Sequence, residues 1–304
     1  MSSRIVNSTA LITGGSSGIG LEYARQLAAR GCELILVSNR EAELRDASQA
    51  LSAAAAPAAS AASAAPAAPA TPAAPAAPAA SATSAALAAP SAPAVHTLCI
   101  DLASHGAAEE VLSWCDAKGL QPDILICNAG MFYMEYLSEE NLPKAQAMMT
   151  LHAETTTELC ILFGSRMKAR GEGRILIMSS LTARIPAPGI AIYSATKAYL
   201  KSFGRSFSYE MRPYGVTVTT VCPAAVDTAL YPLPPGLRRT LKHLGIIKSP
   251  RWLVNRALKA LFKGKRTVSP GLTNLLLPPL IALLPARWID FLGMKWIHKD
   301  NTHA

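Results

Sequence analysis

The sequence has few features of a secreted or metal-binding protein. Its six cysteines form no CxxC pair, and no histidine stands at metal-ligand spacing from them. We therefore expect reduced thiols in a protein core and no metal site. A predicted strand at residues 9–13 leaves no room before it for a cleaved leader, which predicts a cytoplasmic location.

Acidic residues are almost absent from the C-terminal part of the chain. Residues 236–299 hold thirteen Lys and Arg but one acid, Asp290, whereas acids slightly outnumber bases in the first 235 residues. A basic region on a near-neutral body favours a local anionic partner, such as a lipid headgroup or a phosphorylated substrate, over a general nucleic-acid coat. We expect no nucleic-acid partner.

One stretch, residues 47–94, lacks charge altogether and holds eight prolines in a repeating AAP pattern. This composition predicts a disordered Ala/Pro-rich surface insertion. Lengthening a connection from about 15 to about 60 residues adds only about 1.2 kcal/mol of closure entropy, so a fold tolerates it. The 256 remaining residues suit one nucleotide-binding α/β domain. We assign residues 1–271 to that domain and 272–304 to an apolar, basic tail.

Apolar runs alternate with helix-like segments from Thr9 onward. The predicted strands are TALIT, ELILVS, VHTLCID, DILICNAG, GRILIMSS and GVTVTTVCP. Continuous apolar strands separated by helices predict a parallel sheet covered on both faces. Near the end, Ser249 and Pro250 predict the start of a helix that Gly264 ends, and residues 267–270 could form a last strand.

The tail contains the most apolar segment of the chain. Its strictly apolar part, residues 275–286, is about 18 Å long as a helix, against about 30 Å of bilayer hydrocarbon, so we do not expect it to span a membrane. Prolines at positions 270, 278, 279 and 285 interrupt it. Aromatic and basic residues beside it favour a segment that lies in a membrane interface or contacts another subunit. These residues are Arg287, Trp288, Lys295, Trp296 and Lys299.

A glycine-rich segment, TGGSSGIG at 13–20, follows the first strand and opens a helix. Its glycines allow a tight turn and close approach of the backbone to a pyrophosphate at the helix N-terminus. Because the spacing is not GxGxxG, a simple loop is the alternative. The cofactor-binding candidates in this turn are Gly14, Ser16, Ser17, Gly18, Ile19 and Gly20.

The end of the second strand lacks the carboxylate that NAD sites place there. Asn39 and Arg40 follow Ser38 instead, which favours the 2′-phosphate of NADP over NAD, with Arg40 as its clamp. A solvated arginine at a helix start is the alternative reading. Further candidates follow the next two strands: Asp101, Leu102, Asn128, Ala129 and Gly130.

Tyr193 and Lys197 stand four residues apart in YSATK, so a helix projects both from one face. An ammonium about 4 Å from a phenolate contributes on the order of 4 kcal/mol, or about three pKa units, which makes tyrosine a useful acid and base. Ser180 lies thirteen residues earlier, at the end of a strand. Each residue alone also has an ordinary reading: an interface tyrosine, a solvated lysine or a helix-capping serine.

Together these residues resemble the short-chain dehydrogenase/reductase family over residues 9–228, apart from the insertion. The match consists of TGGSSGIG, NAG at 128–130, Ser180 with YSATK, and PAAVDT at 223–228. The resemblance implies a Rossmann-like doubly wound sheet of about seven strands and a homodimer or homotetramer. It assigns Tyr193 as acid and base, Lys197 as its electrostatic partner and cofactor-ribose ligand, and Ser180 as the group that orients the substrate oxygen. The cradle for the nicotinamide amide would include Pro223, Val226 and Thr228.

The sequence departs from the family pattern at three positions. Cys127 replaces an asparagine of NNAG, and Ala224 replaces a glycine. His152 stands where the family usually has the asparagine that anchors a proton-relay water. If the backbone carbonyl does that work, His152 can replace it; otherwise its ring lines the substrate pocket, joins the relay, or is a buried helix histidine.

We therefore expect an NADP(H)-dependent oxidoreductase that interconverts a ketone and a secondary alcohol. The tail favours an apolar or acyl-type substrate, as in the 3-oxoacyl and 17β-hydroxysteroid reductase-like branch of the family. The alternatives are a catalytically silent NADP-binding scaffold or redox sensor, and a lipid reductase that contacts a membrane surface through residues 272–298.

Overall fold

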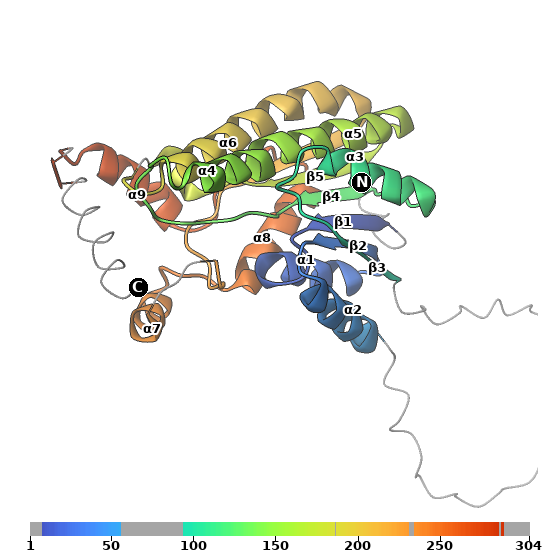
Figure 1. Cartoon of the computed structure of the whole chain (residues 1–304), viewed down its shortest axis with the longest axis horizontal. Coiled ribbons are helices and arrows are strands. Elements are labelled where there is room, and N and C mark those ends of the chain that lie inside the picture. Colours follow the sequence, from blue (N-terminus) through green and yellow to red (C-terminus); the bar gives the residue numbers. More distant parts are fainter. Residues whose placement is uncertain (1–7, 56–93, 186, 231–233, 286, 289–304) are drawn as a thin grey trace, which may run out of the picture.

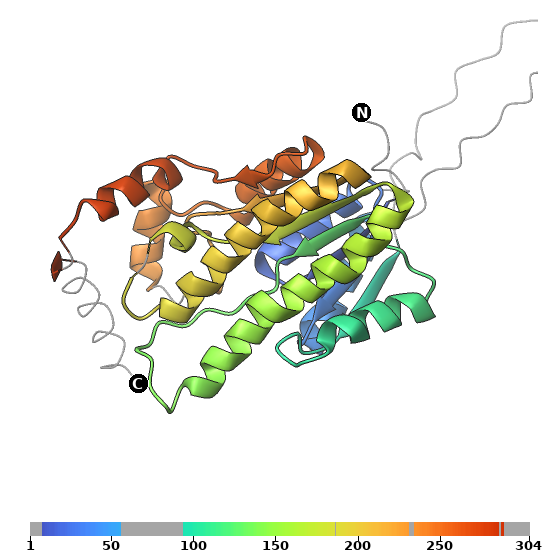
Figure 2. The ribbon, with the colours of Figure 1, turned by 90° about the horizontal axis from the view of Figure 1, so that it is seen from above.

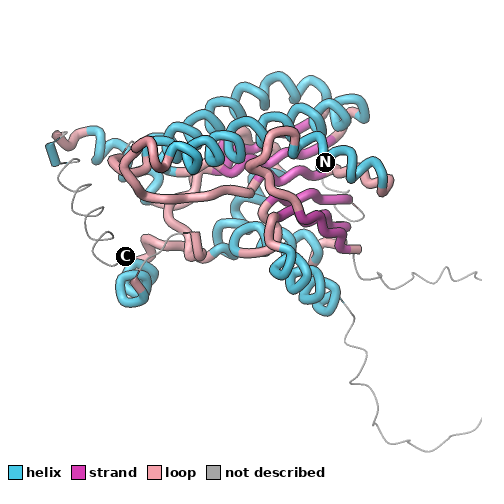
Figure 3. The backbone as a smooth tube through the Cα atoms, viewed as in Figure 1, coloured by secondary structure: helices cyan, strands magenta, loops and turns pink. Residues whose placement is uncertain are grey.

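The computed structural model describes residues 8–55, 94–185, 187–230, 234–285 and 287–288. These residues form a parallel sheet of seven strands, in the order β3-β2-β1-β4-β5-β6-β7, with helices on both faces (Figures 1 and 3). The strands are β1 Thr9–Thr13, β2 Glu33–Ser38, β3 Val95–Cys99, β4 Ile124–Cys127, β5 Gly173–Met178, β6 Val216–Val221 and β7 Thr267–Val268. The predicted doubly wound sheet is thereby confirmed.

Two sets of helices cover the sheet, one on each face. The larger helices are α1 Gly18–Ala28, α2 Glu41–Ala55, α3 Ala107–Ala117, α4 Leu142–Met149, α5 Thr155–Arg170, α6 Ala191–Met211, α7 Pro235–His243, α8 Pro250–Phe262 and α9 Thr273–Ala282. Figure 1 shows α1, α2 and α8 below the sheet and α3, α5 and α6 above it. Short helical turns occupy Thr150–Glu154, Leu181–Arg184 and Arg212–Tyr214.

The strands are buried on both faces because their side chains alternate between two cores. Ala10 and Ile12 of β1 join the core under α1, α2 and α8, whereas Leu11 joins the core under α3, α5 and α6. The strand order reverses between β1 and β4. In open parallel sheets, ligands bind at the carboxyl ends of the strands at such a reversal.

The predicted insertion begins later than expected, because α2 continues to Ala55. Leu44, Ala47 and Leu51 recur at helical spacing and are all buried, and alanine is a strong helix former. The prediction that residues 47–55 belong to the loop is therefore wrong. Residues 56–93 lie outside the described residues.

The thiols lie in the core with one exception. Five free cysteines are buried, but Cys99 is exposed, because β3 is the edge strand of the sheet. The predicted helix start at Ser249 is confirmed: its hydroxyl oxygen accepts a hydrogen bond of 3.2 Å from the backbone N–H of Trp252.

Within the tail, Thr273–Ala282 form a helix, α9, which continues through Pro278 and Pro279, and residues 286 and 289–304 lie outside the described residues. Proline lacks an N–H, so the carbonyls of Asn274 and Leu275 lose their helical donors, and the helix ends three residues later. Within the described ranges, each helix is too short or too polar to cross a bilayer.

Candidate active site

The glycine turn and β4 are joined by direct hydrogen bonds at the point where the strand order reverses. The Asn128 Nδ2 donates to the carbonyl oxygen of Thr13 at 3.0 Å, and the Thr13 hydroxyl oxygen accepts from the backbone of Asn128 and Ala129. A Cβ at Gly20 would collide with the carbonyl oxygen of Gly14. The bare glycine lets α1 lie directly on the turn, and Asn128 serves to hold that turn.

The residues after β2 lie at the surface, where Arg40 forms an ion pair with a carboxylate. The Arg40 Nη1 is 2.7 Å from Glu43 Oε1, and the Arg40 side chain is 66% exposed. The hydroxyl of Ser16 also donates to Glu43, at 3.2 Å. The hydrogen bond from Arg40 is the main cause that lowers the pKa of Glu43, and the hydrogen bond from Ser16 adds to it. Sequence reasoning missed this carboxylate, although its spacing of three residues from Arg40 on a helix favours an ion pair.

The residues after β3 contribute less to the site than those after β4. Asp101 is exposed and its carboxylate accepts a hydrogen bond from the backbone N–H of Ala103, whereas Leu102 is buried.

Gly130, after β4, lies next to both His152 and Lys197. A Cβ at Gly130 would stand 3.0 Å from Nε2 of His152 and 3.6 Å from Nζ of Lys197. The bare backbone at Gly130 and in the glycine turn leaves room for a dinucleotide, so these residues fit the cofactor that the sequence predicts.

Tyr193 and Lys197 are both buried on α6 and lie together. The Lys197 Nζ is 5.6 Å from the centroid of the Tyr193 ring and donates to the carbonyl oxygen of Met178 at 3.1 Å. Burial lowers the pKa of Lys197 to about 8. Its ammonium form therefore still predominates at neutral pH and places a positive charge next to the phenol.

Ser180 follows β5 by two residues and caps the short helical turn Leu181–Arg184. Its hydroxyl oxygen accepts from the backbone N–H of Thr182 at 3.2 Å, so the capping role anticipated as an alternative is present. A hydroxyl has one hydrogen and two lone pairs, so the bond leaves its hydrogen for an acceptor such as a carbonyl oxygen. The neighbouring Ser179 donates to the backbone oxygen of Lys197 at 2.6 Å, which joins β5 to α6.

His152 is fully buried and both of its ring nitrogens have partners. Its Nε2 accepts from the backbone N–H of Met131 at 3.1 Å, and its Nδ1 lies 3.0 Å from the hydroxyl oxygen of Thr196. Because the Thr196 hydroxyl donates to the carbonyl oxygen of Tyr193, we assign the ring hydrogen to Nδ1. Burial and the charge of Lys197 hold the pKa of His152 well below its ordinary value, so the ring is neutral.

A π-helical turn surrounds His152 at Thr150–Glu154, between α4 and α5. The backbone N–H of Thr155 bonds to the carbonyl oxygen of Thr150, five residues back, in place of the usual four. Such turns shift the helical hydrogen bonds by one residue and recur at functional sites. This local change at the predicted relay position was not visible in the sequence.

An apolar wall stands beside Tyr193, and sequence reasoning did not find it. The ring of Phe132 meets the Tyr193 ring edge to face, with centroids 4.9 Å apart. The same cluster contains Met148 and Ile190, with further residues of the segment after β4 packed against it. The run MFYM after Gly130 was the available signal.

The segment from Pro223 to Thr228 lies beside the glycine turn and Ser180. The backbone N–H of Leu181 donates to the carbonyl oxygen of Pro223 at 2.8 Å, and a Cβ at Gly18 would lie 3.5 Å from Cγ2 of Thr228. Val226 is buried and pairs with Lys248 in an isolated bridge. The structure thus brings the predicted nicotinamide cradle next to Ser180 and to the glycine turn predicted for the pyrophosphate. Asn39, Arg40 and Asp101 are exposed beyond β2 and β3.

Comparison with known proteins decides the family. The family model for short chain dehydrogenases matches residues 8–70 and 67–232. The chain belongs to the short-chain dehydrogenase family. This dehydrogenase is 27% identical to a very-long-chain 3-oxoacyl-CoA reductase of Pyrenophora tritici-repentis, over 82% of this chain and 62% of that one. It is also 27% identical to a protein of the same name from Bos taurus, over 73% of this chain and 60% of that one. The chain spans about three fifths of the length of these two relatives.

Solved structures show the same fold. A short-chain dehydrogenase from Sphingobium yanoikuyae in complex with NADPH is 25% identical with a TM-score of 0.67, over 95% of this chain and 94% of that one. The L-sorbose reductase from Gluconobacter frateurii, also complexed with NADPH, has a TM-score of 0.67 at 22% identity, over 89% of this chain and 97% of that one. At the latter identity the likeness concerns the fold alone.

Proposed function

We propose that this dehydrogenase interconverts a ketone and a secondary alcohol with NADP(H), in the direction of reduction, on an apolar or acyl-type substrate. The observation that supports it most strongly is the buried pair of Tyr193 and Lys197, next to Gly130 and at the edge of the sheet where a dinucleotide fits. A protein that only binds a cofactor has no need for a buried cation beside a phenol, because burying that charge costs stability.

Each residue of the site has a separate role in carbonyl reduction. When bound, NADPH would supply the hydride that reduces the carbonyl group. The Ser180 hydroxyl donates a hydrogen bond to the carbonyl oxygen and orients it. The Tyr193 hydroxyl donates its proton to the same oxygen as negative charge develops there, and the Lys197 ammonium stabilises the phenolate that remains.

NADP preference rests on Arg40. The ion pair of Arg40 with Glu43 is exposed, and such pairs contribute about 0–1 kcal/mol, so a 2′-phosphate can replace the carboxylate as partner of the guanidinium. The NADPH bound by the relative from Sphingobium yanoikuyae is consistent with this preference. The other proposed cofactor contacts are Tyr193 and Lys197 with the residues predicted after β1, β3, β4 and β6.

An acyl-type substrate is supported by two separate observations. The relatives from Pyrenophora tritici-repentis and Bos taurus are named as reductases of very-long-chain 3-oxoacyl-CoA. Phe132, which is partly exposed and packs against the cluster of buried Met148 and Ile190, presents apolar surface next to Tyr193. Long hydrocarbon chains gain affinity from burial of such surface.

The test is to follow NADPH absorbance with a graded series of ketones, from small cyclic ketones to 3-oxoacyl thioesters of increasing chain length. We expect turnover that increases with chain length. Stoichiometric NADPH binding without turnover of any ketone would instead support the silent scaffold.

We also propose that the enzyme contacts a membrane surface through residues 272–298. The observation that favours this is a row of exposed leucines on one face of α9, at a spacing of three or four residues. Co-sedimentation of the full chain with vesicles tests it, with Leu275→Gln/Leu276→Gln as the variant that should lose binding. A homodimer or homotetramer is proposed from the family, and the exposed Ile161 of α5 and Tyr199 of α6 are available for such contacts.

A further inference from the structure

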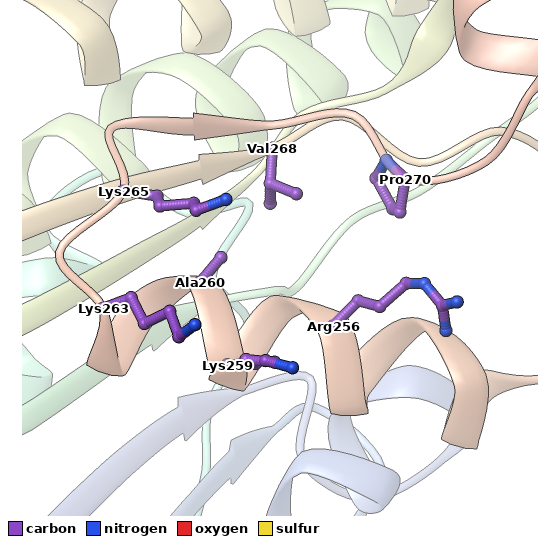
Figure 4. Close-up of a pocket in the computed structure, with 7 residues that line it drawn as sticks. All are labelled: Arg256, Lys259, Ala260, Lys263, Lys265, Val268 and Pro270. Atoms are coloured by element: carbon purple, nitrogen blue, oxygen red, sulfur yellow. The ribbon is translucent and has the colours of Figure 1, made fainter.

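A basic groove runs between α8 and β7 (Figure 4). Four of the side chains that line it are cations: Arg256, Lys259, Lys263 and Lys265. Ala260 of α8 and Val268 of β7 face each other between them (Figure 4). The cavity measures about 260 Å³, which is ample for a phosphate group and its water.

The groove has no internal counter-charge among the described residues. The eight ion pairs found there involve none of the four cations. Residues 236–288 contain no Asp or Glu at all. The end of α8 contributes about half a negative charge, which offsets only a fraction of four positive ones. A ligand that enters the groove is therefore selected for negative charge.

The guanidinium of Arg256 is held in place rather than left loose in solvent. Its central carbon lies 3.9 Å from the centroid of the Trp252 ring, one turn earlier on α8. A cation fixed in this way loses less side-chain entropy when it binds an anion. Arg256 also offers a planar set of donors that suits phosphate oxygens.

A second copy of this chain is a poor occupant of the groove. A twofold interface brings the same patch of both subunits together, so the lysines of one copy would face the lysines of the other. Such like-charge contacts oppose association. Lysines beside β7, which ends the sheet, also discourage edge-to-edge pairing with another strand.

The groove is linked directly to the exposed leucines of α9. Pro270 lines the groove, and its carbonyl oxygen accepts from Nδ2 of the buried Asn274 of α9 at 2.7 Å. Figure 2 shows α8 and α9 along the same side of the molecule. The exposed leucines of α9 and its two flanking cap residues are Leu272, Leu275, Leu276, Leu280 and Leu283. Cations next to these leucines match the two layers of a membrane interface, headgroup phosphates outside and acyl chains beneath.

We propose that the groove between α8 and β7 binds the headgroup phosphates of anionic lipids while the leucines of α9 enter the acyl boundary. The groove proposal rests on the proposed membrane contact. It adds to that contact the site that recognises the charge of the lipids. The reductase activity in solution does not depend on it.

The test compares the full chain and two double variants on vesicles of phosphatidylcholine alone and with one third phosphatidylglycerol. Lys259→Gln/Lys263→Gln removes two charges from the groove. Lys118→Gln/Lys168→Gln removes two exposed charges elsewhere and is the matched control. We expect the groove variant to bind anionic vesicles about thirtyfold more weakly, the control to stay within about threefold of the wild type, and all three to bind neutral vesicles weakly. Soluble turnover of NADPH should be equal in all three.

The remaining outcomes separate the inference from the contact on which it rests. If the wild type does not bind anionic vesicles, the groove proposal and the proposed membrane contact are both wrong. If Leu275→Gln/Leu276→Gln abolishes vesicle binding but the groove variant binds normally, the groove is not the lipid site and the inference alone is overturned. If titration with inorganic pyrophosphate shows binding in the groove without any binding to vesicles, the ligand is a free phosphate compound and the membrane proposal is wrong.

Discussion

The imidazole of His152 stands edge-on to the phenol ring of Tyr193, with ring centroids 5.8 Å apart and planes inclined by 70°. A chain of hydrogen bonds reinforces this contact, from Met131 through His152 and Thr196 to the carbonyl oxygen of Tyr193. His152 thus connects the segment after β4 to the first turns of α6. Because both ring nitrogens are used in these bonds, we assign His152 a positioning role.

The first prediction concerns the replacement of His152 by the residue usual in the family. An amide offers one acceptor and a donor, as the neutral imidazole does, so His152→Asn should keep turnover within about a hundredfold of the wild type. His152→Leu would leave the N–H of Met131 without its partner and should lower the free energy of unfolding by about 1–3 kcal/mol. Steady-state kinetics and urea unfolding check the two variants. A larger loss of turnover in His152→Asn would mean that the ring itself takes part in proton transfer.

The second prediction concerns cofactor choice. Arg40→Ala should raise the KM for NADPH by about 10- to 100-fold, the value of a charge-assisted hydrogen bond, and leave the KM for NADH nearly unchanged. Glu43→Gln should lower the KM for NADPH, because it removes the carboxylate that competes for Arg40. Arg45→Ala, which removes an exposed cation of α2, is the control. Equal effects of Arg40→Ala on both cofactors would exclude a role in recognising the 2′-phosphate.

Much of this fold and site could be predicted from the sequence because the signals are local. Apolar runs and the glycine turn predicted the first six strands and the edge of the sheet that carries the site. Contacts between distant segments could not be predicted in the same way. The carboxylate of Glu43 reaches Ser16 of the glycine turn only after α2 packs beside it, and Phe132 reaches Tyr193 across sixty residues of chain. The length of α2 was missed because alanine-rich composition was read as loop, although Leu44, Ala47 and Leu51 continue the helical pattern.

The third prediction links the cost of burying Lys197 to pH. Burial lowers its pKa from 10.5 to about 8, so between these values the unfolded chain binds more protons, and this lysine makes stability rise with pH. Below pH 8 the folded protein carries the full cost of the buried charge, roughly 3 kcal/mol. Lys197→Met should therefore abolish turnover but raise the free energy of unfolding by about 1–3 kcal/mol at pH 7.

Urea unfolding at pH 7 and pH 10 measures this effect. The advantage of Lys197→Met over the wild type should shrink as the pH rises towards 10. Lys201→Met, one turn further along α6 and partly exposed, should show neither the gain nor its pH dependence. A variant less stable than the wild type at pH 7 would show that the ammonium contributes net stability.

The fourth prediction concerns the apolar wall. Phe132→Ala removes the edge-to-face contact with Tyr193 and apolar surface from the substrate side, so the KM for a long-chain 3-oxoacyl thioester should rise about tenfold. A small cyclic ketone should be affected less. Tyr136→Ala, at an exposed position in the same segment, serves as control. If both variants behave alike with both substrates, Phe132 does not contact the acyl chain.

The most direct test of the account is the turnover of Tyr193→Phe, because this change removes one oxygen and keeps the ring that contacts Phe132 and His152. We predict a loss of at least about a thousandfold in turnover with a 3-oxoacyl thioester, within the range expected for a lost general acid. The affinity for NADPH, measured by titration, should stay within about threefold. Turnover of Tyr193→Phe within tenfold of the wild type would contradict the proposal that Tyr193 supplies the proton.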